Sequence, residues 1–238
     1  QLLSYTQNVL INMNANIIVS IEGNIGSGKS TLLHHIQATK MENISDKNII
    51  LLKEPIDEWE KIMDENGNTI LKLFYENPAE YAFSFQMMAY RSRLTNLKKI
   101  MEDKNNSIIV TERSLFTDRY VFAQMLYDDK KIRPIDFTIY LNWFDSFIKE
   151  YPVHKVIYIN SSPNICAERI LTRSRNGETN ISFDYLQNCH KYHENMMKYY
   201  NSIITPNNTY IFNGNLNKDN RIHELNNMMS FICLNNIS

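Results

Sequence analysis

Apolar residues gather in five short runs that are rich in β-branched side chains, and longer stretches with helical spacing separate the runs. The runs cover residues 16–22, 48–53, 107–111, 155–159 and 209–212. Strands that alternate with helices in this way predict an α/β fold with a parallel sheet that helices cover on both faces. The chain has 238 residues, of which 43% are hydrophobic, and is long enough to bury the core of one such domain.

Two prolines predict where the longest helices begin. Pro78 opens an apolar periodicity that reaches Ile100, within a helical insertion between the second and third runs, and Pro134 opens another that reaches Phe147. Proline is favoured at the first position of a helix, where its missing N–H would have no partner. Since no linker divides the sequence, we expect a single domain over residues 16–238 and a flexible tail over residues 1–15.

The first run leads into the spacing G-x-x-x-x-G-K-S, which spans Gly23 to Ser30 and precedes an amphipathic stretch. A strand, a glycine-rich loop and a helix in this order are typical of a phosphate-binding loop. Backbone N–H groups, the positive end of the helix dipole and Lys29 would face phosphate oxygens, and Ser30 offers a hydroxyl to Mg²⁺. ATP or GTP is therefore the expected ligand, and an ordinary glycine-rich turn is the alternative.

Composition narrows the class of protein further. The net charge is −1 with 21% charged residues, so the charge balance does not suggest a nucleic acid backbone as a partner. The three cysteines include no C-x-x-C pair, which argues against a zinc ribbon or a disulfide framework and favours a reducing compartment. Residues 1–16 resemble no secretory or transit peptide, and no run approaches the roughly 20 apolar residues of a membrane span. A cytoplasmic location is expected, with neither nucleic acid nor membrane as a partner.

Charged residues follow the runs at the carboxyl edge of the expected sheet, which is where open parallel sheets form active sites. The second run ends in Glu54 and the third in Glu112 and Arg113. The helix expected after the fourth run ends in three arginines: Arg169, Arg173 and Arg175. Because Arg169 and Arg173 share a helix face and repel each other, an anion between them is expected. Residues 173–182 would form a lid over the phosphates, with a solvated basic surface as the alternative.

Further motifs stand at the same edge: I-E-G-N-I-G at 21–26, E-P at 54–55 with Trp59, Y-E-N-P at 75–78, F-S-F-Q at 83–86, E-R-S at 112–114 and D-R-Y at 118–120. Their order and spacing resemble the deoxyribonucleoside kinases, specifically the deoxycytidine, deoxyguanosine and deoxyadenosine kinase branch. The resemblance covers about residues 16–215. It implies a P-loop kinase fold with a five-stranded parallel sheet, flanking helices and a short arginine-rich lid. It also implies transfer of the γ-phosphate of ATP to the 5′-hydroxyl of a deoxynucleoside, for nucleotide salvage.

The resemblance assigns roles to the matched residues. Glu54, Arg113 and Lys29 would be catalytic, with Glu54 taking the proton of the 5′-hydroxyl, and Ser30 and Glu112 would hold Mg²⁺. The residues expected to bind ATP are Gly23, Asn24, Ile25, Gly26, Ser27, Gly28, Lys29, Ser30, Thr31, Arg169, Arg173 and Arg175. The residues expected to bind the acceptor are Glu54, Trp59, Tyr75, Phe85, Gln86, Arg93, Arg113, Asp118 and Glu178. The lid departs from the family pattern at Gly177, where the family has an acid.

The sequence indicates the preferred base less clearly than it indicates the reaction. Gln86 can pair with cytosine or with a purine edge. By resemblance, Arg93 and Asp118 form the pair that the cytidine and purine branch uses, where thymidine-preferring relatives carry apolar side chains, and Ala89 resembles the deoxycytidine type. Phe116 is expected beside Trp59 and Phe85 as a further aromatic wall. A thymidine-preferring or broad-specificity deoxynucleoside kinase is the alternative.

Two other classes of P-loop protein fit less well. A nucleoside monophosphate kinase would need basic groups in the acceptor pocket, where this chain has Tyr75, Gln86 and Glu178. A GTP-binding switch would carry D-x-x-G after the third run and an N-K-x-D motif, but the chain has E-R-S there and no N-K-x-D.

Two remaining features concern the helices. The relatives are commonly dimers, so the resemblance predicts a homodimer joined through residues 78–104 and 134–151. His190 and His193 are spaced for one helix face, but no third ligand is suitably placed, so we interpret them as surface histidines and not as a zinc site.

Overall fold

The five predicted strands form one parallel sheet. The computed structural model describes residues 16–39, 47–104, 106–173, 181–203, 206–216 and 221–233, so the predicted tail lies outside the described residues. The strands are β1 (Ile17–Glu22), β2 (Asn48–Leu52), β3 (Ser107–Glu112), β4 (Lys155–Asn160) and β5 (Thr209–Asn213). Their order in the sheet is β2-β3-β1-β4-β5, and every pairing is parallel. Each predicted strand is confirmed to within one residue at either end.

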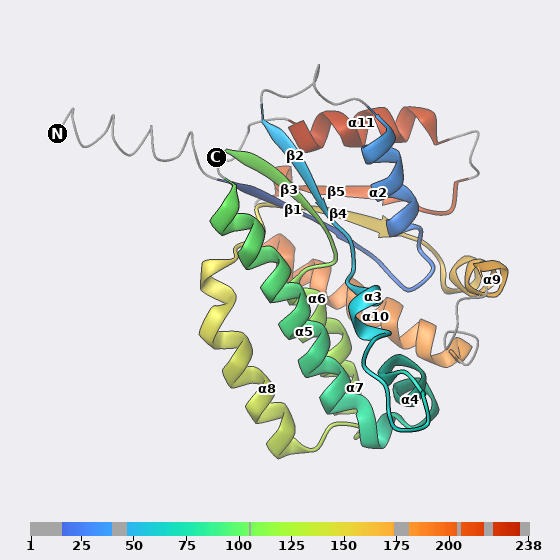
Figure 1. Cartoon of the computed structure of the whole chain (residues 1–238). Helices are drawn as coiled ribbons and strands as arrows, with labels where there is room; N and C mark the ends of the chain where they lie inside the picture. The colour runs from blue at the N-terminus through green and yellow to red at the C-terminus, as the bar shows by residue number, and fades with distance from the viewer. Residues whose placement is uncertain are drawn as a thin grey trace.

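Helices cover both faces of this sheet (Figure 1). One face carries α2 (Lys29–Ala38) and α11 (Ile222–Cys233), and the other carries α5 (Pro78–Asp103), α8 (Pro134–Phe147) and α10 (Phe183–Ile203). Shorter elements join them: α3 (Ile56–Trp59), α4 (Ile70–Glu76), α6 (Leu115–Thr117), η2 (Asp118–Ala123), α7 (Gln124–Asp128), η3 (Ile148–Glu150), α9 (Pro163–Arg173) and η5 (Pro206–Asn208). No helix in the described parts of the chain is both long and apolar enough to cross a membrane.

Burial on both faces explains why the strands appear in the sequence as nearly continuous apolar runs. In β1, Ile17 and Val19 pack toward α2 and α11, whereas Ile18 between them packs toward α5 and α8. Each successive side chain therefore enters a different core, as the period of two in a strand requires. The carboxyl edge of this sheet is where open parallel sheets form their sites.

The predicted helix starts are confirmed, because Pro78 and Pro134 occupy the first turns of α5 and α8. The helix α5 spans 26 residues and lies beside α8 (Figure 1). Its buried positions recur at three- and four-residue spacing, so one stripe of the helix faces the domain interior. Phe85, Gln86 and Arg93 belong to that stripe, and α5 thereby carries three of the predicted acceptor residues inward.

The surface position expected for His193 is wrong, since this side chain is fully buried in α10. Its ring stacks on Tyr158 and meets the edge of Phe122. The Cys189 carbonyl accepts a 2.7 Å hydrogen bond from Nδ1, and Nε2 has no hydrogen-bond partner among the described atoms. Burial lowers the pKa of His193 to about 3, because a second ring proton would find no acceptor. The apolar residues of α10 at helical spacing on either side of His193 were the signal that could have placed it inside.

We expect this buried histidine to make the fold sensitive to mild acid. In the unfolded chain His193 takes up a proton as the pH falls below about 6.5, whereas in the folded chain it stays neutral until the pH nears its pKa of about 3. The unfolded state therefore binds more protons in this window, and stability falls as the pH falls. Between pH 6.5 and 5 the loss amounts to about 2 kcal/mol. Urea unfolding of the wild type and of His193→Phe, each at pH 6.5 and at pH 5, measures this loss of stability. Equal pH dependence in the two proteins would contradict the expectation.

Candidate active site

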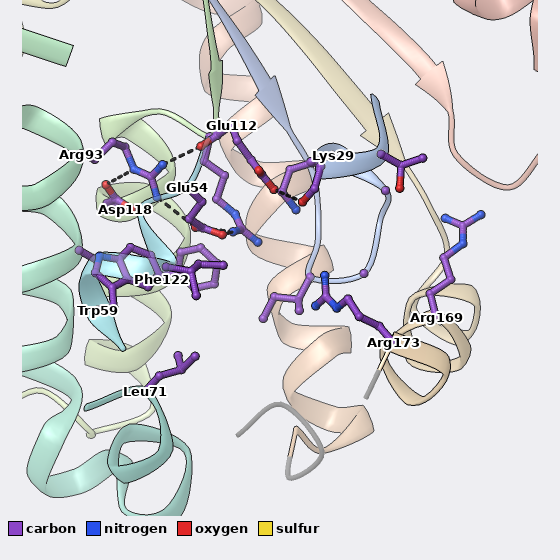
Figure 2. A pocket seen from close by; sticks show the side chains of 18 of the residues that line it. Lys29, Glu54, Trp59, Leu71, Arg93, Glu112, Asp118, Phe122, Arg169 and Arg173 are labelled. Carbon is purple, nitrogen blue, oxygen red and sulfur yellow. Dashed lines mark hydrogen bonds and ion pairs between the residues drawn. The ribbon is translucent and has the colours of Figure 1, made fainter. Parts of the chain in front are cut away.

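One cavity of about 720 Å³ lies where β1, β2 and β3 end. Its lining joins the loop after β1 to side chains of α3, α4 and α5 and to the turn after β3. Lys29, which follows β1, and Glu54, which follows β2, both open onto the cavity. Figure 2 shows Glu54 between a group formed by Arg93, Asp118 and Trp59 and a second group that includes Lys29 and Arg173.

The glycine-rich loop has the backbone geometry that its sequence predicts. Gly23 and Gly26 have φ angles of 144° and 77°, a region that side chains with a Cβ rarely adopt. A Cβ would lie 2.8 Å from the Ile159 carbonyl oxygen at Gly23 and 2.5 Å from the Cys166 carbonyl oxygen at Gly26. The loop therefore packs directly against β4 and α9, and any side chain at these two positions would displace it.

Lys29, in the first turn of α2, is folded back into the glycine-rich loop. Its Nζ donates to the carbonyl oxygens of Gly23 at 3.0 Å and of Asn24 at 2.7 Å. Burial, and then the positive charge of Arg113, lower the pKa of Lys29 to about 7. Glu112 and Glu54 favour the charged form of Lys29 but do not offset its burial, so a bound anion beside Nζ would stabilise the protonated lysine.

Ser30 and Glu112 form the one predicted metal pair. The Ser30 hydroxyl donates to the Glu112 carboxylate at 2.8 Å, so both oxygens face the same point beside the loop. Mg²⁺ prefers oxygen ligands and keeps several waters or phosphate oxygens, so one hydroxyl and one carboxylate suit it. Within the described ranges, no group of three or more His, Cys, Asp or Glu side chains could hold a metal alone. The pair therefore fits Mg²⁺ bound together with a phosphate group.

Glu54 follows β2 and is gripped by two arginines. Arg113 Nη1 donates to both carboxylate oxygens, at 2.6 and 2.7 Å, and Arg93 Nη2 donates to one of them at 3.1 Å. Burial alone would raise the pKa of Glu54, but Arg113 and then Arg93 outweigh it and lower this pKa to about 2. Glu54 is therefore an ionised carboxylate throughout the neutral pH range.

Arg113 owes its position to an unusual backbone. Its φ angle is 64°, in the left-handed region that costs free energy for a residue with a side chain. Its N–H donates to the Ile21 carbonyl at 2.9 Å, which anchors the turn to β1. The guanidinium carbon lies 5.1 Å from the centre of the Phe122 ring. The turn thus directs Arg113 into the cavity, and backbone strain of this kind is typical of functional sites.

Arg93 connects Glu54 to the far end of the cavity. Its Nε donates to Asp118 Oδ2 at 2.9 Å and its Nη1 to the Glu112 carbonyl at 2.6 Å. Burial raises the pKa of Asp118 to about 6, against the opposing charge of Arg93, so Asp118 is ionised at pH 7. One guanidinium therefore joins two of the three predicted acceptor carboxylates, Glu54 and Asp118.

Aromatic side chains form the wall of the cavity on this side. Phe85 stacks on Phe74 at 4.6 Å between ring centres and meets the edge of Trp59 at 5.4 Å. The prediction that Phe116 belongs to this wall is wrong: its ring packs against Tyr120, Phe144 and Tyr200 and does not line the cavity. Phe122 of the π-helix η2 lines the cavity instead.

Comparison with known proteins decides the family. The family model described as deoxynucleoside kinase matches residues 19–232. The chain belongs to the deoxynucleoside kinase family. A probable deoxycytidine kinase of fowlpox virus is 34% identical, with 74% of this chain and 69% of that protein covered. Human deoxycytidine kinase is 31% identical (75% and 74% covered), and a mitochondrial deoxyguanosine kinase of Xenopus laevis is 27% identical (75% and 72% covered).

A deoxynucleoside kinase is a phosphotransferase. Most of the site residues predicted for this kinase line the cavity of about 720 Å³. The lining includes Ile25, Gly26, Gly28, Lys29, Ser30, Thr31, Glu54, Trp59, Tyr75, Phe85, Gln86, Arg93, Glu112, Arg113, Asp118, Arg169 and Arg173. Gly23, Asn24 and Ser27 belong to the same loop but do not line the cavity. Arg175 and Glu178 lie outside the described residues.

Arg169 makes contacts in the kinase that its sequence position did not indicate. It donates to the Ser27 carbonyl at 3.0 Å and to the Gly214 carbonyl at 2.8 Å, so it ties the phosphate loop to the end of β5. Figure 2 shows Arg173 extending from α9 toward the centre of the cavity, whereas Arg169 points away from it along the rim. The two arginines of this helix are therefore in different surroundings.

Several lining residues were missed by the sequence interpretation: Ile56, Leu71, Phe74, Phe122, Tyr185 and Arg221. Leu71 and Phe74 precede Tyr75 at spacings that put them on the same side of α4, and this signal was available. Arg221, whose Nε donates to the Leu216 carbonyl at 2.7 Å, reaches the cavity from the segment before α11. Nothing in its local sequence indicated that position.

Proposed function

We propose that the kinase transfers the γ-phosphate of ATP to the 5′-hydroxyl of deoxycytidine, of purine deoxynucleosides or of both, in nucleotide salvage in the cytoplasm. The observation that carries the proposal is that Lys29, Glu54, Arg93 and Asp118 line one cavity, in which Glu54 lies between Lys29 and the pair formed by Arg93 and Asp118 (Figure 2). A volume of about 720 Å³ is in the range that encloses a small ligand. The family supports a deoxynucleoside as the acceptor.

Glu54 would aim the 5′-hydroxyl and accept its proton. A carboxylate with a pKa of about 2 is a weak base, but phosphoryl transfer passes through a loose transition state that needs positioning more than early deprotonation. The hydroxyl would donate to the carboxylate, which Arg113 and Arg93 hold in place. The proton would then move to Glu54 as the new bond to phosphorus forms.

The phosphate loop would bind the donor. Phosphate oxygens would replace the two carbonyls that Lys29 contacts and would raise its pKa from about 7. Arg173 would add positive charge from α9, as phosphoryl transfer requires. Mg²⁺, held by Ser30 and Glu112 with the phosphates, would neutralise charge on the transferring group.

Hydrogen-bonding chemistry supports the proposed bases. Asp118 is an acceptor and favours an exocyclic amine, as on cytosine or adenine, while Arg93 favours a ring nitrogen that accepts. The O4 carbonyl of thymine would face the Asp118 carboxylate, acceptor against acceptor. Gln86, which is 2% exposed, can donate or accept according to the base.

Initial rates with ATP and Mg²⁺ on the four common deoxynucleosides test the proposal. We expect deoxycytidine, a purine deoxynucleoside or both to give the highest kcat/KM, with thymidine lowest. Equal or greater kcat/KM for thymidine would favour the thymidine-preferring or broad-specificity alternative. No turnover of any nucleoside, with turnover of a nucleoside monophosphate, would overturn the proposal.

The Arg93→Met, Asp118→Ala double variant is expected to shift this preference. Removing both partners leaves no unpaired buried charge at the base end of the cavity. The ratio of kcat/KM for deoxycytidine to that for thymidine should fall at least about tenfold. Because Arg93 also contacts Glu54, the absolute rates should fall for every nucleoside, so the ratio is the quantity to compare. An unchanged ratio would remove Arg93 and Asp118 from base selection.

We also propose that the kinase is a homodimer joined through α5 and α8. Ile135, Ile139 and Trp143 recur at every fourth position of α8 and are 62%, 41% and 49% exposed. Three large apolar side chains on one helix face form a patch that water solvates poorly. Sedimentation of Ile139→Lys, Trp143→Lys should give a monomer, and Asp145→Lys on another side of α8 should stay dimeric. A wild-type monomer at micromolar concentration would contradict the proposal.

A further inference from the structure

Glu22 is a buried acidic residue that no step of the proposed reaction uses. It is the last residue of β1 and directly precedes Gly23 of the glycine-rich loop. Its side chain is 0% exposed and does not line the cavity of about 720 Å³. Glu22 therefore does not touch a ligand in that cavity, and any effect that it has on the site must pass through the residues that it contacts.

Three hydroxyl groups converge on the carboxyl group of Glu22. Ser20 Oγ donates to Oε1 at 2.5 Å, and Ser114 Oγ donates to the same oxygen at 2.6 Å. Thr117 Oγ1 donates to Oε2. The three donors are buried as well, so bulk water does not compete for these contacts. Hydrogen bonds are electrostatically stronger in such surroundings than in water.

The Ser114 hydroxyl is held from both sides. The Tyr200 hydroxyl, which comes from α10, lies 3.0 Å from Ser114 Oγ. A serine hydroxyl has one proton, and that of Ser114 is directed at Glu22, so Tyr200 is the donor in this second contact. Ser114 therefore links α10 to the end of β1.

The two partners of Glu22 outside β1 adjoin predicted acceptor residues. Ser114 follows Arg113, and Thr117 precedes Asp118. Because the Arg113 N–H donates to the Ile21 carbonyl at 2.9 Å, two consecutive residues of β1 hold two consecutive residues of the turn after β3. Arg113 has a left-handed φ angle of 64°, and a strained backbone of this kind persists only where its surroundings hold it firmly.

We propose that Glu22 is a positioning residue, which fixes the turn that carries Arg113 relative to the glycine-rich loop. The role of Arg113 in the reaction rests on the proposed function, whereas the attachment of the turn to β1 does not. Without the contact between Glu22 and Ser114, the turn would relax and carry the guanidinium away from the two oxygens of Glu54, which it contacts at 2.6 and 2.7 Å. Small errors of position in such a site are costly in rate.

Ser114→Ala and Ser20→Ala form a matched pair, because each removes one buried hydroxyl from the same oxygen of Glu22. The Ser20 contact stays within one strand, whereas the Ser114 contact crosses from β1 to the turn. We expect Ser114→Ala to lower kcat about tenfold with the KM for ATP within about twofold of wild type, and Ser20→Ala to keep both within about twofold. Equal kcat values in the two variants would overturn the proposal.

A double variant separates position from stability. Ser114→Ala leaves the buried Tyr200 hydroxyl without its acceptor, and adding Tyr200→Phe removes that hydroxyl. We expect the Ser114→Ala, Tyr200→Phe variant to regain stability in urea relative to Ser114→Ala while kcat stays low. A kcat that returns to the wild-type value together with stability would assign Ser114 a structural role and overturn the proposal.

Crystal structures of the matched pair test the attachment without reference to activity. In Ser114→Ala, Arg113 Nη1 should no longer lie within hydrogen-bond distance of both Glu54 oxygens, whereas Ser20→Ala should keep these contacts. An unmoved Arg113 in Ser114→Ala would overturn the proposal. If Arg113 moves but the wild-type kinase phosphorylates no nucleoside, the attachment of the turn stands and the proposed function fails, so the two failures are distinguishable.

Discussion

Replacing Glu54 with glutamine is expected to lower kcat by about 10²–10⁴-fold while the KM for the nucleoside changes only a few-fold. The amide has the size of the carboxylate and can still accept a hydrogen bond from Arg113, but it cannot take the proton of the 5′-hydroxyl. Steady-state kinetics with deoxycytidine and ATP measure the effect. Asp57→Asn, an exposed residue of α3, loses the same charge three positions away and should leave kcat unchanged.

The same substitution removes the carboxylate that Arg113 contacts, whereas Arg93 keeps its ion pair with Asp118. Leaving a buried charge unpaired costs about 3–5 kcal/mol, so Glu54→Gln is also expected to be less stable than wild type. Retained ATP affinity in the variant would show that the phosphate loop is intact and that the loss lies in the transfer step. Turnover equal to that of wild type would remove Glu54 from the proposed role.

Lys29→Met is expected to lower kcat/KM for ATP by at least about 10²–10³-fold, because one buried positive charge that faces the transferring phosphate is lost. The fold should survive, since methionine fills the space of the lysine stem and removes a charge that burial disfavours. Titration with a fluorescent ATP analogue measures the change in ATP affinity, and steady-state rates measure the change in kcat. Lys98→Met, an exposed lysine of α5, is the control.

The lowered pKa of Lys29 adds a second readout to this comparison. With a pKa of about 7, most of the unliganded kinase lacks the Lys29 proton at pH 8, and bound phosphate would restore it. ATP binding to the wild type should therefore take up most of one proton per site at pH 8. Calorimetry in two buffers of different ionisation enthalpy measures this uptake, which should be absent in Lys29→Met. Uptake that is equal in both proteins would place the titrating group elsewhere.

The strands and the site edge were predictable because each depends on local chemistry. A strand buried on both faces must be apolar at nearly every position, so its run is visible in the sequence. Parallel strands end at one edge, so Lys29, Glu54, Glu112 and Arg113 could be brought together without coordinates. The structure confirms that these four residues line one cavity.

The prediction of Phe116 as part of the cavity wall, which Phe122 forms instead, shows where prediction from sequence failed. Phe116 lies in the short α6, and the π-helix η2 begins only two residues later. A π-helix has more residues per turn than an α-helix, so the side that faces the cavity cannot be derived from a period of 3.6. The surface position predicted for His193 was wrong for another reason. Its polar side chain indicated the surface, although the residues around it at helical spacing in α10 are apolar.

The double attachment of Arg93 has a consequence for fidelity. The same guanidinium holds Asp118, at the proposed base end of the cavity, and Glu54, beside the proposed reaction centre. A nucleoside with a mismatched base would draw Arg93 out of line and so disturb the carboxylate that orients the alcohol. The kinase would then discriminate against such a nucleoside partly after binding, because the bound nucleoside would be phosphorylated slowly.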